Sequence, residues 1–206
     1  MATTYPITLD TANIKSIRFE PKTAVAQDNS LFTGQQKTYV YSKQMWVISV
    51  ELAAKTRADA EAVLCQLLSL NGAQGTFYIG DPIYTTARGI ATGEPVIKGA
   101  GQTGNTLITD GWTTSQTGIL KAGDWLQVGT GSTRQLVKVV ADADSDGAGD
   151  ATLEIWPRIR TAFADNTSLV VSSPTGIWRM QGAMPSWELN SDRIYSGISF
   201  TASESF

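Results

Sequence analysis

The chain has 206 residues, of which 42% are hydrophobic, and its 16 basic and 19 acidic residues give a net charge of −3. This balance excludes the clustered positive surface that wraps nucleic acid, and the absence of histidine excludes the usual catalytic triads and zinc sites. The length suits one large domain or two small ones. Because neither a signal-like leader nor an apolar run of about 18 residues is present, we expect a soluble protein without a secretion signal.

The first third of the chain is predicted to contain β-strands. Apolar side chains alternate along "KQMWVISVEL", at Trp46, Ile48, Val50 and Leu52. This period of two predicts a half-buried strand over residues 38–53. Upstream, residues 7–10, 14–21 and 23–28 are predicted as three shorter strands, separated by Asn, Pro and Asp-Asn breaks.

One α-helix is predicted over residues 56–71. Apolar residues recur there at helical spacing, at Ala60, Val63, Leu64, Leu67 and Leu68. Thr56 can cap the start with Asp59 three residues later, and Asn71-Gly72 can end the helix. The single cysteine, Cys65, lies in this run, and we expect it to be buried as a small hydrophobe rather than to be a reactive thiol.

After Pro82 the chain becomes rich in Gly, Thr, Ser and Asp. Short apolar runs recur at intervals typical of a small β-barrel or sandwich, in "PVIKG", "NTLITDGW", "GDWLQVG", "RQLVKVV", "ATLEIWP" and "SLVVSS". The tail returns to paired strands, with apolar positions at Trp178, Met180, Trp187, Leu189, Ile194, Ile198 and Phe200.

These elements predict a mainly β, α+β fold in two parts. Residues 1–82 and 177–206 would form a discontinuous β-sandwich platform with one helix, and residues 83–176 an inserted all-β domain. Insertion at an exposed turn requires that the host chain's ends lie close together. A hairpin broken between Ile79 and Trp178 would meet that requirement.

The loop "DADSDGAGDATLE" has the spacing of a calcium-binding EF-hand. Asp142, Asp144 and Asp146 stand at positions one, three and five. Position twelve, which must supply a bidentate carboxylate, is Leu153, and the flanking runs predict strands where the motif needs helices. We therefore reject a metal site here and predict the turn of a β-hairpin.

Trp112, Asp124 and Trp125 are candidate carbohydrate contacts in β loops, because an aromatic face can stack on a sugar ring while a carboxylate binds its hydroxyls. Trp125, like Trp46 and Trp156, lies in an alternating apolar run, and we favour a core role for these three.

Two carboxylates of a hydrolase could come from Asp110, Asp124, Glu154 and Asp165, but no pair stands out. We expect neither an enzyme nor a cofactor. Arg158 and Arg160 share one side of an extended segment, where we expect them to be solvated; a partner's acidic rim is the alternative.

The run from the predicted helix onward resembles distal tail proteins of long-tailed bacteriophages. The resemblance covers roughly residues 45–180 and rests on the order of its segments, which are "LLSLNGAQGTFYIGDPIYTTARG", "LKAGDWLQVG", "RQLVKVVADADSDGAGDATLEIWPRIR" and "WRM".

The resemblance implies a structural protein of the virion tail, forming a ring that is typically a hexamer. Its platform would be a tail-tube-like β-sandwich with one helix that joins the tail tube to the baseplate or tail hub, and a further β-domain would project outward. DNA would pass through the ring as cargo, and no membrane would be involved. The alternatives are a carbohydrate-binding module or receptor-binding accessory protein that recognises a host-surface glycan, and a tail tube or tube-terminator subunit.

Overall fold

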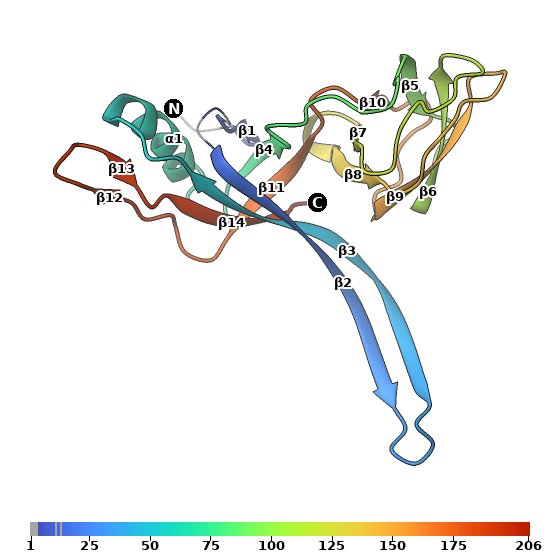
Figure 1. Ribbon diagram of the computed structural model, residues 1–206, viewed down its shortest axis with the longest axis horizontal. Coiled ribbons are helices and arrows are strands. Elements are labelled where there is room, and N and C mark those ends of the chain that lie inside the picture. The colour runs from blue at the N-terminus through green and yellow to red at the C-terminus, as the bar shows by residue number, and fades with distance from the viewer. Residues whose placement is uncertain (1–3, 11, 13) are drawn as a thin grey trace.

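A computed structural model describes residues 4–10, 12 and 14–206 of the chain. Over these residues the fold is mainly β, with one α-helix, two six-stranded sheets and a small two-stranded sheet (Figure 1). The predicted fold class is confirmed, since one mixed sheet carries the helix and the other is antiparallel and barrel-like.

The first sheet has the strand order β1-β4-β11-β14-β3-β2. Only β1 and β4 pair in parallel, and the other neighbours are antiparallel. Its strands are β1 (Ile7–Thr8), β2 (Ile14–Asn29), β3 (Gln36–Leu52), β4 (Thr76–Gly80), β11 (Thr175–Gln181) and β14 (Ser199–Glu204). The strand predicted over residues 38–53 is confirmed as most of β3.

The second and third upstream strand candidates form one continuous strand, β2, so the predicted break near Pro21 is wrong. Pro21 pairs opposite Trp46 on β3, and β2 is the outermost strand of the sheet. An edge strand tolerates proline because one of its sides has no hydrogen-bonding partner strand.

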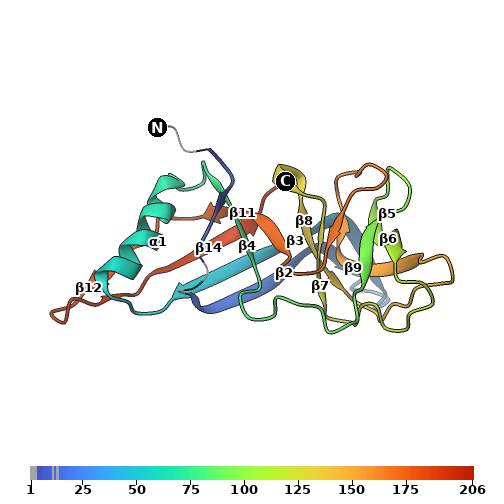
Figure 2. The ribbon, with the colours of Figure 1, turned by 90° about the horizontal axis from the view of Figure 1, so that it is seen from above.

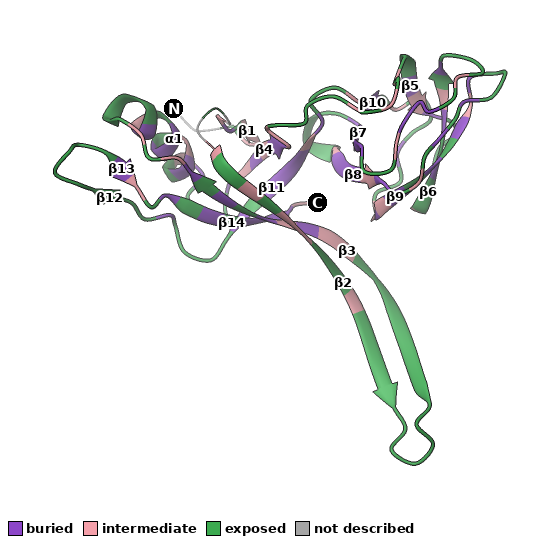
Figure 3. Cartoon of the chain, in the orientation of Figure 1, coloured by how far each residue is buried: buried purple, intermediate pink, exposed green. Residues whose placement is uncertain are grey.

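The β2–β3 hairpin projects far beyond the sheet that it starts from (Figure 1). We call residues 22–44, which include the turn between the strands, the arm. Nearly all of the arm is exposed, as Figure 3 shows, whereas the rest of β3 alternates between buried and exposed residues in contact with the core. The arm is therefore held together by the pairing of its two strands and has no hydrophobic core of its own.

The helix α1 (Arg57–Ser69) packs on the first sheet near the position predicted for it. Thr56 is the N-cap residue, but its hydroxyl donates to the Asp59 carboxylate at 3.3 Å instead of accepting from the backbone. Leu67 and Leu70 are fully buried, whereas Leu68 is 48% exposed, so its predicted place on the apolar face is wrong. Cys65 is also exposed, contrary to the prediction, because the helical turn directs it away from the sheet.

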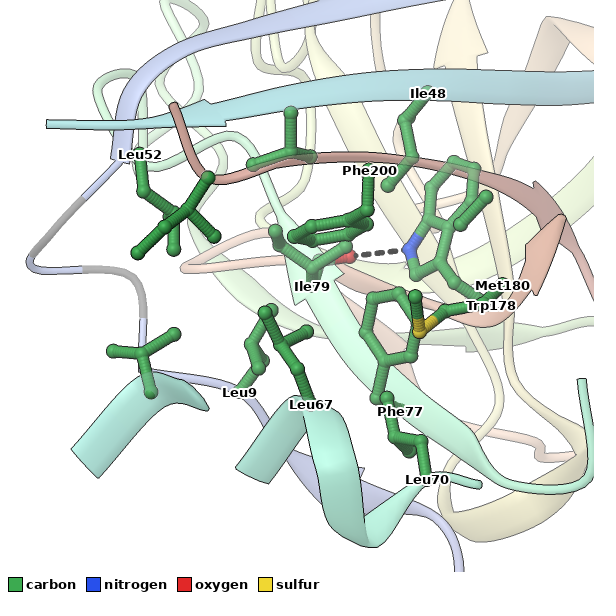
Figure 4. Close-up of a cluster of buried hydrophobic side chains, with 14 of the residues drawn as sticks. Leu9, Ile48, Leu52, Leu67, Leu70, Phe77, Ile79, Trp178, Met180 and Phe200 are labelled. Carbon is green, nitrogen blue, oxygen red and sulfur yellow. Dashed lines mark hydrogen bonds between the residues drawn. The ribbon is translucent and has the colours of Figure 1, made fainter. Parts of the chain in front are cut away.

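Buried side chains from α1 and the first sheet form one core, part of which is drawn in Figure 4. Phe77 of β4 and Phe200 of β14 meet edge to face at 5.9 Å, with Leu67 of the helix and its C-cap residue Leu70 in the same cluster. The indole Nε1 of Trp178 donates to the Ile79 carbonyl at 2.8 Å, so this buried polar atom is satisfied.

The second sheet has the order β10-β7-β8-β9-β6-β5, all antiparallel. All six runs predicted after Pro82 form its strands, which are β5 (Gly93–Ile97), β6 (Gly104–Trp112), β7 (Trp125–Val128), β8 (Gln135–Val139), β9 (Ala151–Ile159) and β10 (Leu169–Val170). A short 3₁₀ turn, η1 (Gly131–Thr133), precedes β8. Hydrogen bonds from Ile97 N to Thr167 O and from Asn166 N to Ile97 O nearly close the barrel.

The chain leaves the first sheet after β4 and returns to it at β11. These strands pair antiparallel, with Gly80 opposite Thr175 and Ile79 opposite Gly176, as expected for a hairpin broken at this place. Seen from above, in Figure 2, the second sheet lies beside the first along the molecule's long axis. A Cβ atom on Gly80 would lie 2.0 Å from the Pro174 carbonyl oxygen, so the exit and return segments approach too closely for any other residue.

The C-terminal strands differ in detail from the prediction. β12 (Glu188–Leu189) and β13 (Tyr195–Ser196) form a separate two-stranded sheet. Trp187 and Ile194 lie outside the strands and are 42% and 36% exposed, and Tyr195 takes the buried position instead.

Candidate functional site

Among the described residues, the arm carries the most exposed large apolar side chains. Leu31 and Phe32 at its tip are 97% and 99% exposed. Val25, Tyr39, Val40 and Tyr41 along its strands are between 44% and 75% exposed. A two-stranded hairpin without a covering layer is at best marginally stable in water, and clustered exposed apolar residues mark interaction sites. The arm is therefore a candidate interface.

An open apolar groove lies where the arm joins the body. It encloses about 310 Å³ and is lined by Pro21, Trp46, Lys138, Val139, Val140 and Trp156. We call it the root groove. Val140 is 53% exposed at its edge, and the rings of Trp46 and Trp156 meet edge to face with centroids 4.3 Å apart. Because Trp46 is only 6% exposed, the apolar surface open to an incoming side chain comes mainly from Trp156 and Val140.

A second, smaller pocket lies at the junction of the two sheets. It encloses about 210 Å³, and its lining includes Asp81, Tyr84, Arg88, Asp124, Trp125 and Lys138. Sequence reasoning missed Tyr84 and Arg88, which are exposed residues of the segment leading into β5. No periodicity or motif marks them, because that segment is irregular.

Asp124 is buried and serves the local backbone. Its two carboxylate oxygens accept hydrogen bonds from the amides of Arg88, Gly89 and Lys121 at 2.9, 3.1 and 2.8 Å. The Arg88 Nε lies 3.5 Å from the same carboxylate. Asp124 therefore holds the entry segment against the turn before β7, and its lone pairs are largely occupied.

Trp125 belongs to an aromatic cluster, as predicted. Its ring lies 4.8 Å from Phe19 and 5.1 Å from Trp46, and the ammonium of Lys138 lies 4.3 Å from its centroid. Its indole Nε1 donates to Asp81 at 3.3 Å. With 7% exposure, Trp125 presents little more than one edge to the junction pocket.

Trp112 is separated from this pocket. It ends β6, is 3% exposed and packs in the core of the second sheet, where its Nε1 donates to Thr109 at 2.8 Å. Of the three candidate carbohydrate contacts, the structure thus brings together Asp124 and Trp125, with Trp112 in a different core cluster.

The aspartate loop connects β8 to β9, as the hairpin reading expects, with Lys138 opposite Trp156. Each carboxylate accepts from a different piece of backbone. Asp142 accepts from Ala122 N at 2.8 Å, Asp144 from Gly118 N at 2.6 Å, and Asp146 from Ala148 N and Asp150 N. The three side chains therefore organise the loop and its neighbours.

These contacts also change acidities in the loop. The Ala122 amide and the ammonium of Lys121, 3.0 Å away, lower the pKa of Asp142. The amides of Asp150 and Ala148 lower the pKa of Asp146. Among the described residues, no group of three or more Cys, Asp or Glu side chains is placed to hold a metal ion.

Arg160, expected to be solvated, is instead largely buried and contacts the first sheet. Its side chain is 15% exposed and pairs with Glu204, which is 2% exposed. Its Nη1 also donates to the Gln44 carbonyl at 2.7 Å, at the root of the arm. Burial raises the pKa of Glu204, and the charge of Arg160 opposes that rise. Gln44 had no distinguishing signal in the sequence, although its Oε1 accepts from Arg158 N at 2.8 Å.

The remaining acidic candidates lie apart on separate elements. Asp110 is on β6 and Glu154 on β9, while Asp165 lies in the loop before β10 and accepts from Gly99 N at 2.6 Å. Within the described residues, no hydrogen bond or ion pair joins any two of Asp110, Asp124, Glu154 and Asp165. The helix of the described residues lacks the length and apolarity to cross a membrane.

Comparison with known proteins gives no match, either to a protein-family model or to a curated protein.

Proposed function

We propose that this protein is a structural subunit of a homo-oligomeric ring at the distal end of a bacteriophage tail. Six copies are the expected number. In this role it joins the tail tube protein to the hub or baseplate proteins and resides in the virion tail. DNA passes through the ring only as cargo. The protein is not an enzyme and uses no cofactor.

The observation that carries this proposal is the arm. Its strands expose Val25, Val40 and Tyr41, and its tip exposes Leu31 and Phe32 almost completely. Such a hairpin gains stability only when a partner covers it. A subunit whose arm is covered by its neighbours in an assembly satisfies that requirement.

The net charges of the arm and of the rest of the chain favour a second copy of this chain as the partner. The arm contains three lysines and one aspartate, whereas the whole chain has 16 basic and 19 acidic residues. The body therefore carries a net negative charge and the arm a net positive charge, which favours the approach of one copy's arm to another copy's body. The resemblance of residues 45–180 to distal tail proteins supplies the class of assembly.

The test is the mass and shape of the purified full-length chain, by light scattering across a concentration series and by electron microscopy. We expect closed rings of uniform copy number, and immunogold labelling at the tail tip of virions. A chain that stays monomeric at all concentrations and labels no tail would contradict the proposal.

A second candidate function is recognition of a host-surface glycan, favoured by the junction pocket. Tyr84 is 73% exposed beside Arg88 and the edge of Trp125, which offers an aromatic face and a cation to a sugar. A glycan array with the full-length chain tests this role. Binding that Tyr84→Ala abolishes, and that Tyr41→Ala on the arm leaves intact, would support it; an array without binding would remove it.

A further inference from the structure

We propose that the arm of one copy docks on a second copy, with the tip residues Leu31 and Phe32 inserted into the root groove of that copy. This inference rests on the proposed self-assembly and names the surfaces that carry it. It concerns two sites of the same chain, one protruding and one concave.

The tip has no partner within its own body. Leu31 and Phe32 are 97% and 99% exposed, in a turn closed by hydrogen bonds from Ser30 N to Gln35 O and from Gly34 N to Ser30 O. The turn backbone is thus satisfied, while both large apolar side chains face water. Aromatic and aliphatic anchors that fill a pocket are the residues that usually dominate an interface.

The root groove has the matching chemistry. Val140 and the half-buried Trp156 present its apolar surface, Trp46 and Val139 lie buried behind them, and Lys138 is its charged member. Trp46 and Trp156 are held by the surrounding core and by their own edge-to-face contact. A preformed apolar groove loses little conformational entropy when it accepts a side chain.

The tip cannot reach the groove of its own chain. Pro21, which lines the groove, is about ten residues from Leu31, and an extended strand rises about 3.3 Å per residue. The tip therefore lies roughly 33 Å from its own groove, at the end of a hairpin that points away from the body (Figure 1). Docking must occur between copies.

A tip-to-groove contact is head-to-tail, so each copy donates one arm and accepts another. Such heterologous contacts close into a ring when the rotation between copies permits it. The tip alone is too small for a stable interface, which buries about 800 Å² on each partner. The exposed Val25, Tyr39, Val40 and Tyr41 extend the apolar surface along the arm toward that size.

A pair of charged substitutions tests the proposal. Phe32→Asp places a charge in the apolar tip, and Val140→Asp places one at the edge of the apolar groove. Both positions are more than half exposed, so neither substitution removes a core side chain. We expect each variant alone to be monomeric by light scattering, with a circular dichroism spectrum like that of the unaltered chain.

Mixing the two variants gives the decisive result. Each mixed pair has one intact tip and one intact groove, so we expect heterodimers and no larger species. If Val140→Asp alone still forms the full oligomer, the arm does not use the root groove, although self-assembly stands. If the unaltered chain itself is monomeric, both this inference and the proposed function fail.

A covalent test locates the contact. In a Cys65→Ser background, Phe32→Cys together with Val140→Cys is expected to give a ladder of disulfide-linked oligomers under mild oxidation, ending at the ring size. Each cysteine alone is expected to give no species beyond a dimer. A double variant that assembles without forming the ladder would overturn the proposed docking site.

Discussion

Arg160 and Glu204 form an ion pair between the two sheets, with Nη2 of Arg160 2.6 Å from Oε1 of Glu204. Arg160 directly follows β9 of the second sheet, and Glu204 ends β14 of the first. The other carboxylate oxygen of Glu204 accepts from Trp46 N at 3.2 Å. One buried cluster thus joins the second sheet, the C-terminal strand and the strand that becomes the arm.

The first prediction concerns this pair. Glu204→Gln removes the charge but keeps the volume, leaving Arg160 without its counter-ion in a largely buried place. Breaking a buried pair in this way costs about 3–5 kcal/mol, so we expect a clear loss in the free energy of unfolding measured with urea. Glu51→Gln, which breaks the exposed pair with Lys15, is the control and should change little. Equal losses in both variants would contradict the role of burial.

The second prediction separates the two faces of α1. Leu67 is fully buried and Leu68 is 48% exposed, although the two leucines are adjacent in the sequence. Leu67→Ala should destabilise the chain by about 2–5 kcal/mol, and Leu68→Ala by no more than about 0.5 kcal/mol. Thermal unfolding of both variants checks the difference, and a larger effect at Leu68 would show that the helix is rotated.

The third prediction concerns Asp124. Asp124→Asn keeps one acceptor oxygen and turns the other acceptor into a donor, so at least one of the amides of Arg88, Gly89 and Lys121 loses its partner. A buried amide without a partner costs about 1–3 kcal/mol. We expect faster hydrogen exchange at those three amides. Asp165→Asn, at an exposed residue that accepts from Gly99 N, is the control and should affect only the Gly99 region.

The fourth prediction is a pH dependence in the aspartate loop. The pKa values of Asp142 and Asp146 lie below their ordinary value of 3.8. Their contribution to stability is therefore present above pH 3.8 and lost as the pH falls through the lower folded-state pKa values. Carboxyl NMR titration should give midpoints below 3.8 for both residues.

Lys121→Gln supplies the control for that titration. It removes the ammonium that helps lower the pKa of Asp142, while the causes acting on Asp146 are backbone amides and Lys98. The midpoint of Asp142 should rise and that of Asp146 should stay. A parallel shift of both would indicate that the substitution had disturbed the whole loop.

Local pattern was sufficient to predict most strands. The six runs of the second sheet each alternate or cluster apolar residues between Gly- and Asp-rich turns, and each forms a strand. The same pattern could not show that β2 runs through Pro21, because proline tolerance depends on the strand's place at the sheet edge. The exposed positions of Cys65 and Leu68 likewise depend on how the helix rotates against the sheet.

The candidate sites depended more strongly on tertiary structure. Trp112 and Trp125 look alike as aromatics in β segments, yet one packs inside the second sheet and the other at the junction. Arg160 gave no sequence signal for its pairing with Glu204, since 43 intervening residues separate charges that only the sheet topology brings together. The sequence did not reveal the arm because strand-forming residues such as Tyr39, Val40 and Tyr41 predict a strand whether or not another layer covers it.

The adjacency of Gly80 and Thr175 has an evolutionary consequence. Because the chain departs and returns at paired positions, the intervening segment can lengthen, shorten or be exchanged without changing the register of β4 and β11. A replacement would need to restore the apolar contacts that Trp125 and Leu136 make with the first core and the ion pair that Arg160 makes with Glu204. The surface that this segment presents can therefore diversify, provided that a replacement keeps Lys138, Val139, Val140 and Trp156, which line the root groove.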